Sequence, residues 1–238
     1  MFVALLPLIV FWLGADTAHA YECSNPCNVA SGDVCVSMAQ VVELGRTVAM
    51  NVGRQKGTCG GVAPFTDDER VLTWSRDPAG PFTPIPVRRE GDFLMVTLDR
   101  PGPYFIEAAA RDGKGAPDRL VLLVVDPATD LVRLHLRPGK GVATSHRPVT
   151  VRWVPAGDLE RFPRSRWPIW QSLDGAGLAR HPMRLPPGRY DVEWIDRARG
   201  RAQTGITSFE VTGGGDIDVT LKAPPAHSPA PSPAPPPR

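Results

Sequence analysis

Short β-prone runs, separated by clusters of Gly, Pro and Asp, constrain the fold of this chain more than any other feature. The runs are apolar or alternating in pattern, and they recur at the spacing typical of β-sandwiches. No segment keeps a 3.6-residue apolar period over the length of a helix. We therefore predict an all-β fold, with strands at 40–44, 46–52, 71–74, 93–98, 104–109, 120–125, 131–136, 149–154, 190–195, 206–211 and 217–221.

The runs divide into two groups, which we expect to form two β-sandwich modules over 40–126 and 128–222. Net charge supports a boundary near Asp126-Pro127, because acidic side chains are in excess before it and basic ones after it. In the first group the run 120–125 is apolar at every position, which is typical of a strand buried on both faces. In the second group 190–194 and 217–221 alternate, which places three apolar side chains of each on one face.

Residues 1–20 have the pattern of a signal peptide. An apolar run over 2–13 is too short to remain as a membrane-spanning helix, and Ala18-His19-Ala20 offers small residues at a cleavage point after Ala20. The region before the run lacks Lys and Arg, so an uncleaved anchor is the alternative. No later segment is long and apolar enough to cross a membrane. We expect a secreted or periplasmic protein without stable membrane insertion after signal cleavage.

The four cysteines all fall in 21–60, a segment that leads into the first module. Their number is even and the expected compartment is oxidising, so two disulfides are predicted, with the pairing open. A zinc site is the alternative, but the spacing lacks a C-x2-C pair and no histidine is near. The predicted disulfide residues are Cys23, Cys27, Cys35 and Cys59.

The chain ends in a segment, 223–238, in which half of the residues are proline and most of the others are Ala or Ser. Such a composition cannot bury enough apolar area to offset the entropy of ordering. We expect a disordered, extended Pro/Ala-rich tail that acts as a spacer or a frayed end.

Two stretches resemble known families. Leu185-Pro186-Pro187-Gly188-Arg189-Tyr190-Asp191-Val192 resembles the signature of transthyretin-like, carboxypeptidase-regulatory-like β-sandwiches, and the match extends over about 185–221. Pro101-Gly102-Pro103-Tyr104-Phe105-Ile106 with Asp112-Gly113 more loosely resembles a hairpin of bacterial immunoglobulin-like modules. The resemblances imply an immunoglobulin-like first sandwich and a transthyretin-like second one. Modules of the latter kind are mainly accessory, so no catalytic residue carries over.

Catalytic and cofactor motifs are absent from the sequence. It lacks a G-x-S-x-G elbow, an H-E-x-x-H motif, a P-loop and a G-x-G-x-x-G motif, and it implies no cofactor and no metal site. His146, beside Ser145, is the only candidate general base, and sequence neighbours rarely face each other as a triad requires. The 27 basic and 25 acidic residues leave a net charge of +2, so charge gives no reason to expect nucleic acid as a partner.

The stretch 161–170 interleaves arginine with aromatic residues inside a long irregular region. Flat rings can stack on sugars, and guanidinium groups can bind carboxylates, phosphates or hydroxyls, so the stretch is a candidate recognition surface. The alternative is that its tryptophans cover a sandwich edge, while Trp153 and Trp194 lie in the core. The candidate ligand-binding residues are Arg161, Arg164, Arg166, Trp167 and Trp170.

These patterns favour an exported, non-catalytic binding or interaction protein of the envelope or extracellular space. Its expected partner is an envelope glycan or an envelope protein, bound through the stretch 161–170. One alternative is a structural subunit or adhesin that assembles through strand edges. The other is a hydrolase of unrecognised type that uses His146.

Overall fold

The computed structural model describes residues 27, 29–57, 61–140, 142, 149–156, 161–172, 182–196 and 203–223. Across these residues the chain forms strands β1 to β17 and one short 3-10 helix, η1, and the all-β prediction is confirmed. The predicted signal peptide, Cys23, Cys59, His146 and residues 224–238 of the predicted tail lie outside the described residues.

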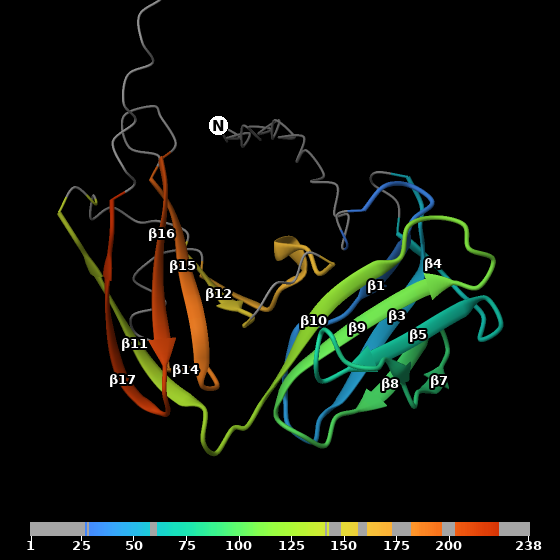
Figure 1. Cartoon of the computed structure of the whole chain (residues 1–238), viewed down its shortest axis with the longest axis horizontal. Helices are drawn as coiled ribbons and strands as arrows, with labels where there is room; N and C mark the ends of the chain where they lie inside the picture. The colour runs from blue at the N-terminus through green and yellow to red at the C-terminus, as the bar shows by residue number, and fades with distance from the viewer. Residues whose placement is uncertain are drawn as a thin grey trace, which may run out of the picture.

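The first module is a sandwich of two sheets built from β1 to β10 (Figure 1). One sheet has the order β1-β3-β8-β7, with β4 also paired to β3, and the other has the order β2-β10-β9-β5-β6. Apolar side chains from both sheets, among them Met50, Leu94 and Leu122, form its core. The strands are β1 (Val34–Ser37), β2 (Val41–Glu43), β3 (Thr47–Gln55), β4 (Val62–Pro64), β5 (Arg70–Ser75), β6 (Thr83–Pro84), β7 (Arg88–Glu90), β8 (Phe93–Thr97), β9 (Gly102–Ala110) and β10 (Asp118–Val125).

The second module is a smaller sandwich, with sheets β14-β11-β17 and β13-β12-β15-β16. Trp153 and Trp194 are buried in its core, as the sequence predicts, together with Tyr190 and Val192. The strands are β11 (Leu131–Pro138), β12 (Val149–Val154), β13 (Ile169–Ser172), β14 (Pro182–Arg184), β15 (Gly188–Asp196), β16 (Gln203–Val211) and β17 (Gly215–Leu221).

Every strand predicted from the sequence is present, but several short strands were not predicted. The unpredicted strands have two to four residues each, too few to show an alternating pattern: β1, β4, β6, β7, β13 and β14. The two runs predicted on either side of Gly45 are β2 and β3, and they belong to different sheets. Gly45 has φ +77, so the chain turns there from one sheet of the sandwich to the other.

Each module contains a tyrosine whose hydroxyl donates to the carbonyl four residues earlier. Tyr104 donates to the Arg100 oxygen at 3.2 Å, and Tyr190 donates to the Pro186 oxygen at 2.7 Å. Both tyrosines are buried and follow a Pro-Gly turn. Such a corner is a recurrent feature of immunoglobulin-like sandwiches, where it holds the turn that leads into a core strand.

Strand β10 joins the cores of the two modules, and the prediction that both of its faces are buried is confirmed. Leu120, Leu122 and Val124 belong to the core of the first module. Val121, Leu123 and Val125 on the opposite face belong to the core of the second. Figure 1 shows β10 on the side of the first module that faces the second. The two sandwiches are therefore packed together through a shared apolar strand.

Cys27 and Cys35 form a disulfide, which confirms part of the cysteine prediction. Cys35 lies in β1, and both residues are buried. The bond ties the chain just before β1 to the first sheet. Disulfides of this kind form and persist in oxidising compartments outside the cytosol.

Candidate functional site

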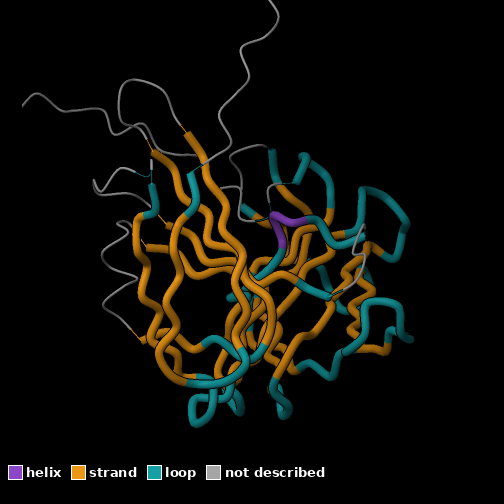
Figure 2. The backbone as a smooth tube through the Cα atoms, turned by 60° about the vertical axis from the view of Figure 1, so that its left-hand side comes forward, coloured by secondary structure: helices purple, strands orange, loops and turns teal. Residues whose placement is uncertain are grey.

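The stretch 161–170, which we call the junction loop, lies between the two modules. Its centre is η1 (Arg164–Arg166), drawn in purple in Figure 2, and its end leads into β13. Pro163 precedes η1 with extended backbone angles, and the Arg166 amide donates to the Pro163 oxygen at 2.8 Å. The chain thereby makes one tight turn that presents Arg166 to the first module.

Arg166 is buried at the junction and forms an ion pair with Asp118 of β10. Its Nε lies 3.1 Å from Asp118 Oδ1 and its Nη2 lies 2.5 Å from Oδ2. The same Nη2 donates to the Val36 oxygen at 2.6 Å, while the Val36 amide donates to Asp118 Oδ2 at 2.8 Å. Burial raises the pKa of the Asp118 carboxyl against the opposing effect of Arg166. The group links β1, β10 and η1 in one hydrogen-bonded network.

The other two arginines of the junction loop are also paired with carboxylates of this chain. Arg161 Nη2 lies 2.8 Å from Glu107 Oε2 on β9. Arg164 Nη2 lies 2.7 Å from Asp191 Oδ2 and 2.5 Å from Glu193 Oε1 on β15. Arg161 thus reaches to the first module and Arg164 to the second.

The two tryptophans of the junction loop are half-buried and pack on their surroundings. Trp167 Nε1 donates to the Phe162 oxygen at 2.9 Å, and the Arg164 guanidinium lies 5.4 Å from the Trp167 ring. The Trp170 ring lies 5.8 Å from that of Tyr190 and borders a cleft between the modules. The structure therefore brings all five predicted ligand-binding residues to the junction, with the three guanidinium groups engaged inside the chain.

Two carboxylates that bind the junction loop have lowered pKa values. Burial acts to raise each pKa, but hydrogen bonds from two arginines outweigh it and hold the pKa below its usual value of 4.5. The pairs are Glu107 with Arg119 and Arg161, and Glu193 with Arg152 and Arg164.

These ion pairs make the stability of the junction dependent on pH in the acidic range. A carboxylate whose pKa is lower in the folded state stabilises the fold above its unfolded pKa, and this contribution is lost as the pH falls through the folded pKa. We expect the denaturation midpoint to fall as the pH drops below about 4.5, and to fall less in an Arg161→Met/Arg164→Met double variant. Chemical denaturation at several pH values measures both. Asp118 is present in both proteins and cancels in the comparison, so parallel curves would contradict the expectation.

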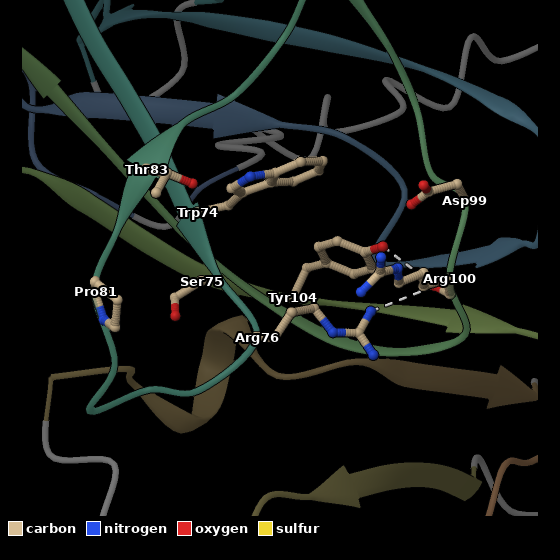
Figure 3. Close-up of a pocket in the computed structure, with 8 residues that line it drawn as sticks. All are labelled: Trp74, Ser75, Arg76, Pro81, Thr83, Asp99, Arg100 and Tyr104. Carbon is tan, nitrogen blue, oxygen red and sulfur yellow. Dashed lines mark hydrogen bonds between the residues drawn. The ribbon is translucent and has the colours of Figure 1, made fainter.

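A hollow of about 390 Å³ lies on the first module, and none of the predicted site residues lines it. Trp74 and Tyr104 form its aromatic part, with ring centroids 4.9 Å apart, and Ser75 lies beside them (Figure 3). The Tyr104 ring is buried, whereas Trp74 is half-buried and presents part of its indole to the hollow. The volume is within the usual range of small-ligand sites.

Arg76 closes one side of the hollow. Its guanidinium lies 4.3 Å from the Tyr104 ring and donates to the Pro101 oxygen at 2.5 Å. Gly102 makes this approach possible, because it has φ +99 and a Cβ atom there would lie 2.9 Å from Arg76 Nη2. The Pro101-Gly102-Pro103 turn thus positions the Arg76 side chain along one side of the hollow.

Three polar side chains on the rim of the hollow are not committed to other parts of the chain that the structure describes. Among the described residues, neither the Asp99 carboxylate nor the Thr83 hydroxyl nor the Arg100 guanidinium forms a side-chain hydrogen bond or an ion pair. Figure 3 shows Asp99 and Thr83 turned toward the hollow from opposite sides. The contrast with the junction loop is direct, because there every arginine is paired with a carboxylate.

Sequence reasoning missed the hollow because its residues are far apart in the chain. Trp74 and Ser75 end β5, Thr83 begins β6, and Asp99 and Arg100 lie in the turn before β9. The available signal was Trp74 itself, which lies near the end of a strand and is followed by the polar sequence Ser75-Arg76-Asp77. Aromatic rings that end a strand beside polar turns are suited to ligand contact.

The described residues contain no group of three or more His, Cys, Asp or Glu side chains arranged to hold a metal ion. No helix in the same part of the chain has the length and apolarity needed to cross a membrane.

Comparisons with known proteins indicate only distant similarity. No protein-family model matches the chain, and no curated protein matches it. Among solved structures, the adhesin InvE of Yersinia pseudotuberculosis is 9% identical, with a TM-score of 0.27 and coverage of 76% of this chain and 61% of the adhesin. The IG1 and IG2 domains of DIP-gamma are 13% identical, with a TM-score of 0.24 and coverage of 79% and 97%. The pilus 2b backbone protein of group B streptococcus is 10% identical, with a TM-score of 0.22 and coverage of 81% and 98%.

This chain therefore spans less than two thirds of the length of the InvE structure. At these TM-scores the likeness carries no argument about function, and the sandwich architecture rests on the sheets described above.

Proposed function

We propose that this chain is an exported, non-catalytic glycan-binding protein that holds one sugar ring in the hollow at Trp74. The observation that carries the proposal is a partly exposed indole that lines the hollow together with three polar side chains, Thr83, Asp99 and Arg100, which form no side-chain hydrogen bond or ion pair among the described residues. The C–H face of a pyranose would pack on Trp74, as apolar ligand surfaces pack on aromatic side chains. Asp99 would accept hydrogen bonds from sugar hydroxyls, and Arg100 and Thr83 would bind further oxygens.

In this proposal the junction loop joins the modules and does not itself bind the ligand. Its arginines would have to leave Glu107, Asp191 and Asp118 before they could bind an external anion. Separating such pairs costs free energy, most of all for the buried Arg166. The Arg100 guanidinium in the hollow carries no such cost among the described residues.

Titration with a panel of envelope and plant glycans, followed by tryptophan emission, tests the proposal. We expect saturable quenching by at least one glycan, with affinity reduced at least about tenfold in Trp74→Ala because the stacking surface is gone. Trp167→Ala is the matched control in the junction loop, and it should bind as the unaltered chain does.

Quenching lost in Trp167→Ala and Trp170→Ala but kept in Trp74→Ala would instead assign the ligand to the junction loop. If the folded protein responds to no glycan, the proposed ligand class is wrong and a protein partner becomes the stronger hypothesis.

Assembly through a strand edge is a second candidate, and β16 favours it. Within the described ranges this nine-residue strand pairs only with β15, and Ile206 is exposed on it. Unpaired strand edges can add a strand from another chain. A monodisperse monomer on size-exclusion chromatography would contradict this candidate.

We also propose that the second sandwich is transthyretin-like. The support for this proposal is the Pro-Pro-Gly turn, which precedes Tyr190 in the core.

A further inference from the structure

One wall of the hollow is formed by a short strand at the edge of the first module. Pro81 and Thr83 line this wall, and Thr83 belongs to β6, a two-residue strand at the edge of its sheet. Among the described residues, strand β6 pairs only with β5, through Thr73 with Pro84 and Trp74 with Thr83. So short a pairing at a sheet edge contributes little stability of its own. The next residue, Ile85, is buried in the first core and its amide donates to the Leu72 oxygen at 3.2 Å, which fixes one end of the wall and leaves the segment 81–83 in need of a second support.

Phe82, which lies between Pro81 and Thr83, connects the wall to the junction loop. The Phe82 ring lies 6.4 Å from that of Phe162 in a stacked arrangement, and the Arg161 guanidinium lies 4.9 Å from the Phe82 ring. Phe162 is 1% exposed, and Arg161 is fixed by its ion pair with Glu107. Phe82 is thereby packed against the core that the two modules share.

We infer that Phe162 and Arg161 of the junction loop position the wall of the hollow through Phe82, so that the second module sets the affinity of a site built on the first. This inference rests on the proposed function. In it Arg161 and Phe162 are positioning residues that do not touch the ligand. Loss of the Phe82 contact would leave Trp74, Asp99 and Arg100 in place and release the 81–83 segment.

Binding of a glycan identified in the panel tests the inference. Phe82→Ala should weaken binding about tenfold. Phe82→Leu keeps an apolar contact with Phe162 and should therefore retain most of the affinity of the unaltered chain. Phe93→Ala is the matched control, because Phe93 is an exposed phenylalanine of the same module that does not border the hollow. Equal binding by Phe82→Ala and the unaltered chain would overturn the inference.

A measurement without ligand separates the inference from the proposed function. In a ¹H–¹⁵N spectrum the indole signal of Trp74 is the one missing from Trp74→Phe. We expect this signal to shift or broaden in Phe82→Ala and to stay unchanged in Phe93→Ala. Arg161→Met, a change at a half-exposed position, should shift it in the same direction and covers the case in which Phe82→Ala does not fold. An unchanged Trp74 signal in these variants refutes the positioning role, whether or not any glycan binds.

Discussion

Replacing Arg166 with methionine is expected to lower the free energy of unfolding by about 3–5 kcal/mol, because it leaves the Asp118 carboxylate buried without its partner. Asp118 is 3% exposed, and its remaining partners include the Val36 amide, which cannot neutralise a charge. Chemical denaturation followed by circular dichroism measures the loss. The double variant Asp118→Leu/Arg166→Met should recover most of it, because it removes both charges from the junction.

Arg161→Met is the control for the Arg166 prediction. Arg161 lies in the same loop and also pairs with a carboxylate, but it is half-exposed and Glu107 keeps Arg119 as a second partner. Exposed ion pairs contribute little, so the expected loss is below about 1 kcal/mol. If the two single variants lose the same stability, the buried network of β1, β10 and η1 is not what holds the modules together.

Truncation of Phe162 to alanine is expected to cost about 3–5 kcal/mol, the usual range for a large buried aromatic side chain. The ring is 1% exposed and contacts Phe105 of the first module edge-on, with centroids 5.3 Å apart. Its loss leaves a cavity in the core that both modules share. We therefore also expect one unfolding transition in the unaltered chain and two in Phe162→Ala.

Calorimetry measures both effects of the Phe162 change. Phe93→Ala removes the same ring from an exposed position and should change stability by no more than about 0.5 kcal/mol. A comparable loss in the two variants, or an unaltered single transition in Phe162→Ala, would show that the modules are joined by other contacts.

The fold could be predicted from the sequence because its main strands carry their own signals. The alternation of Tyr190, Val192 and Trp194 against Asp191 and Glu193 identifies a strand with one apolar face. All three apolar residues are buried in the core, and the two carboxylates on the opposite face pair with Arg164, with Asp191 itself buried. The continuous apolar run of β10 predicted two buried faces, but it could not predict that the second face is covered by the other module.

The interior of the junction could not be predicted, because it depends on pairs distant in the sequence. The sequence around Arg166 gives no sign that this arginine is buried while the other two arginines of the loop are exposed. Its burial depends on the ion pair with Asp118, which lies 48 residues earlier in the chain. Arginine and tryptophan in one loop suit both a recognition surface and a packed junction, so the residue types of 161–170 do not by themselves decide between the two interpretations. The hollow likewise joins β5, β6 and the turn before β9, which only the sandwich topology brings together.

The indole ¹H–¹⁵N signals of the labelled chain, followed through a titration with the glycan that quenches emission most strongly, give the most direct test of the hollow as the binding site. We expect the Trp74 signal to move progressively and to saturate, while the signals of Trp167 and Trp170 stay in place. Movement of the Trp167 or Trp170 signal with Trp74 unchanged would contradict the proposed site and assign the ligand to the junction loop.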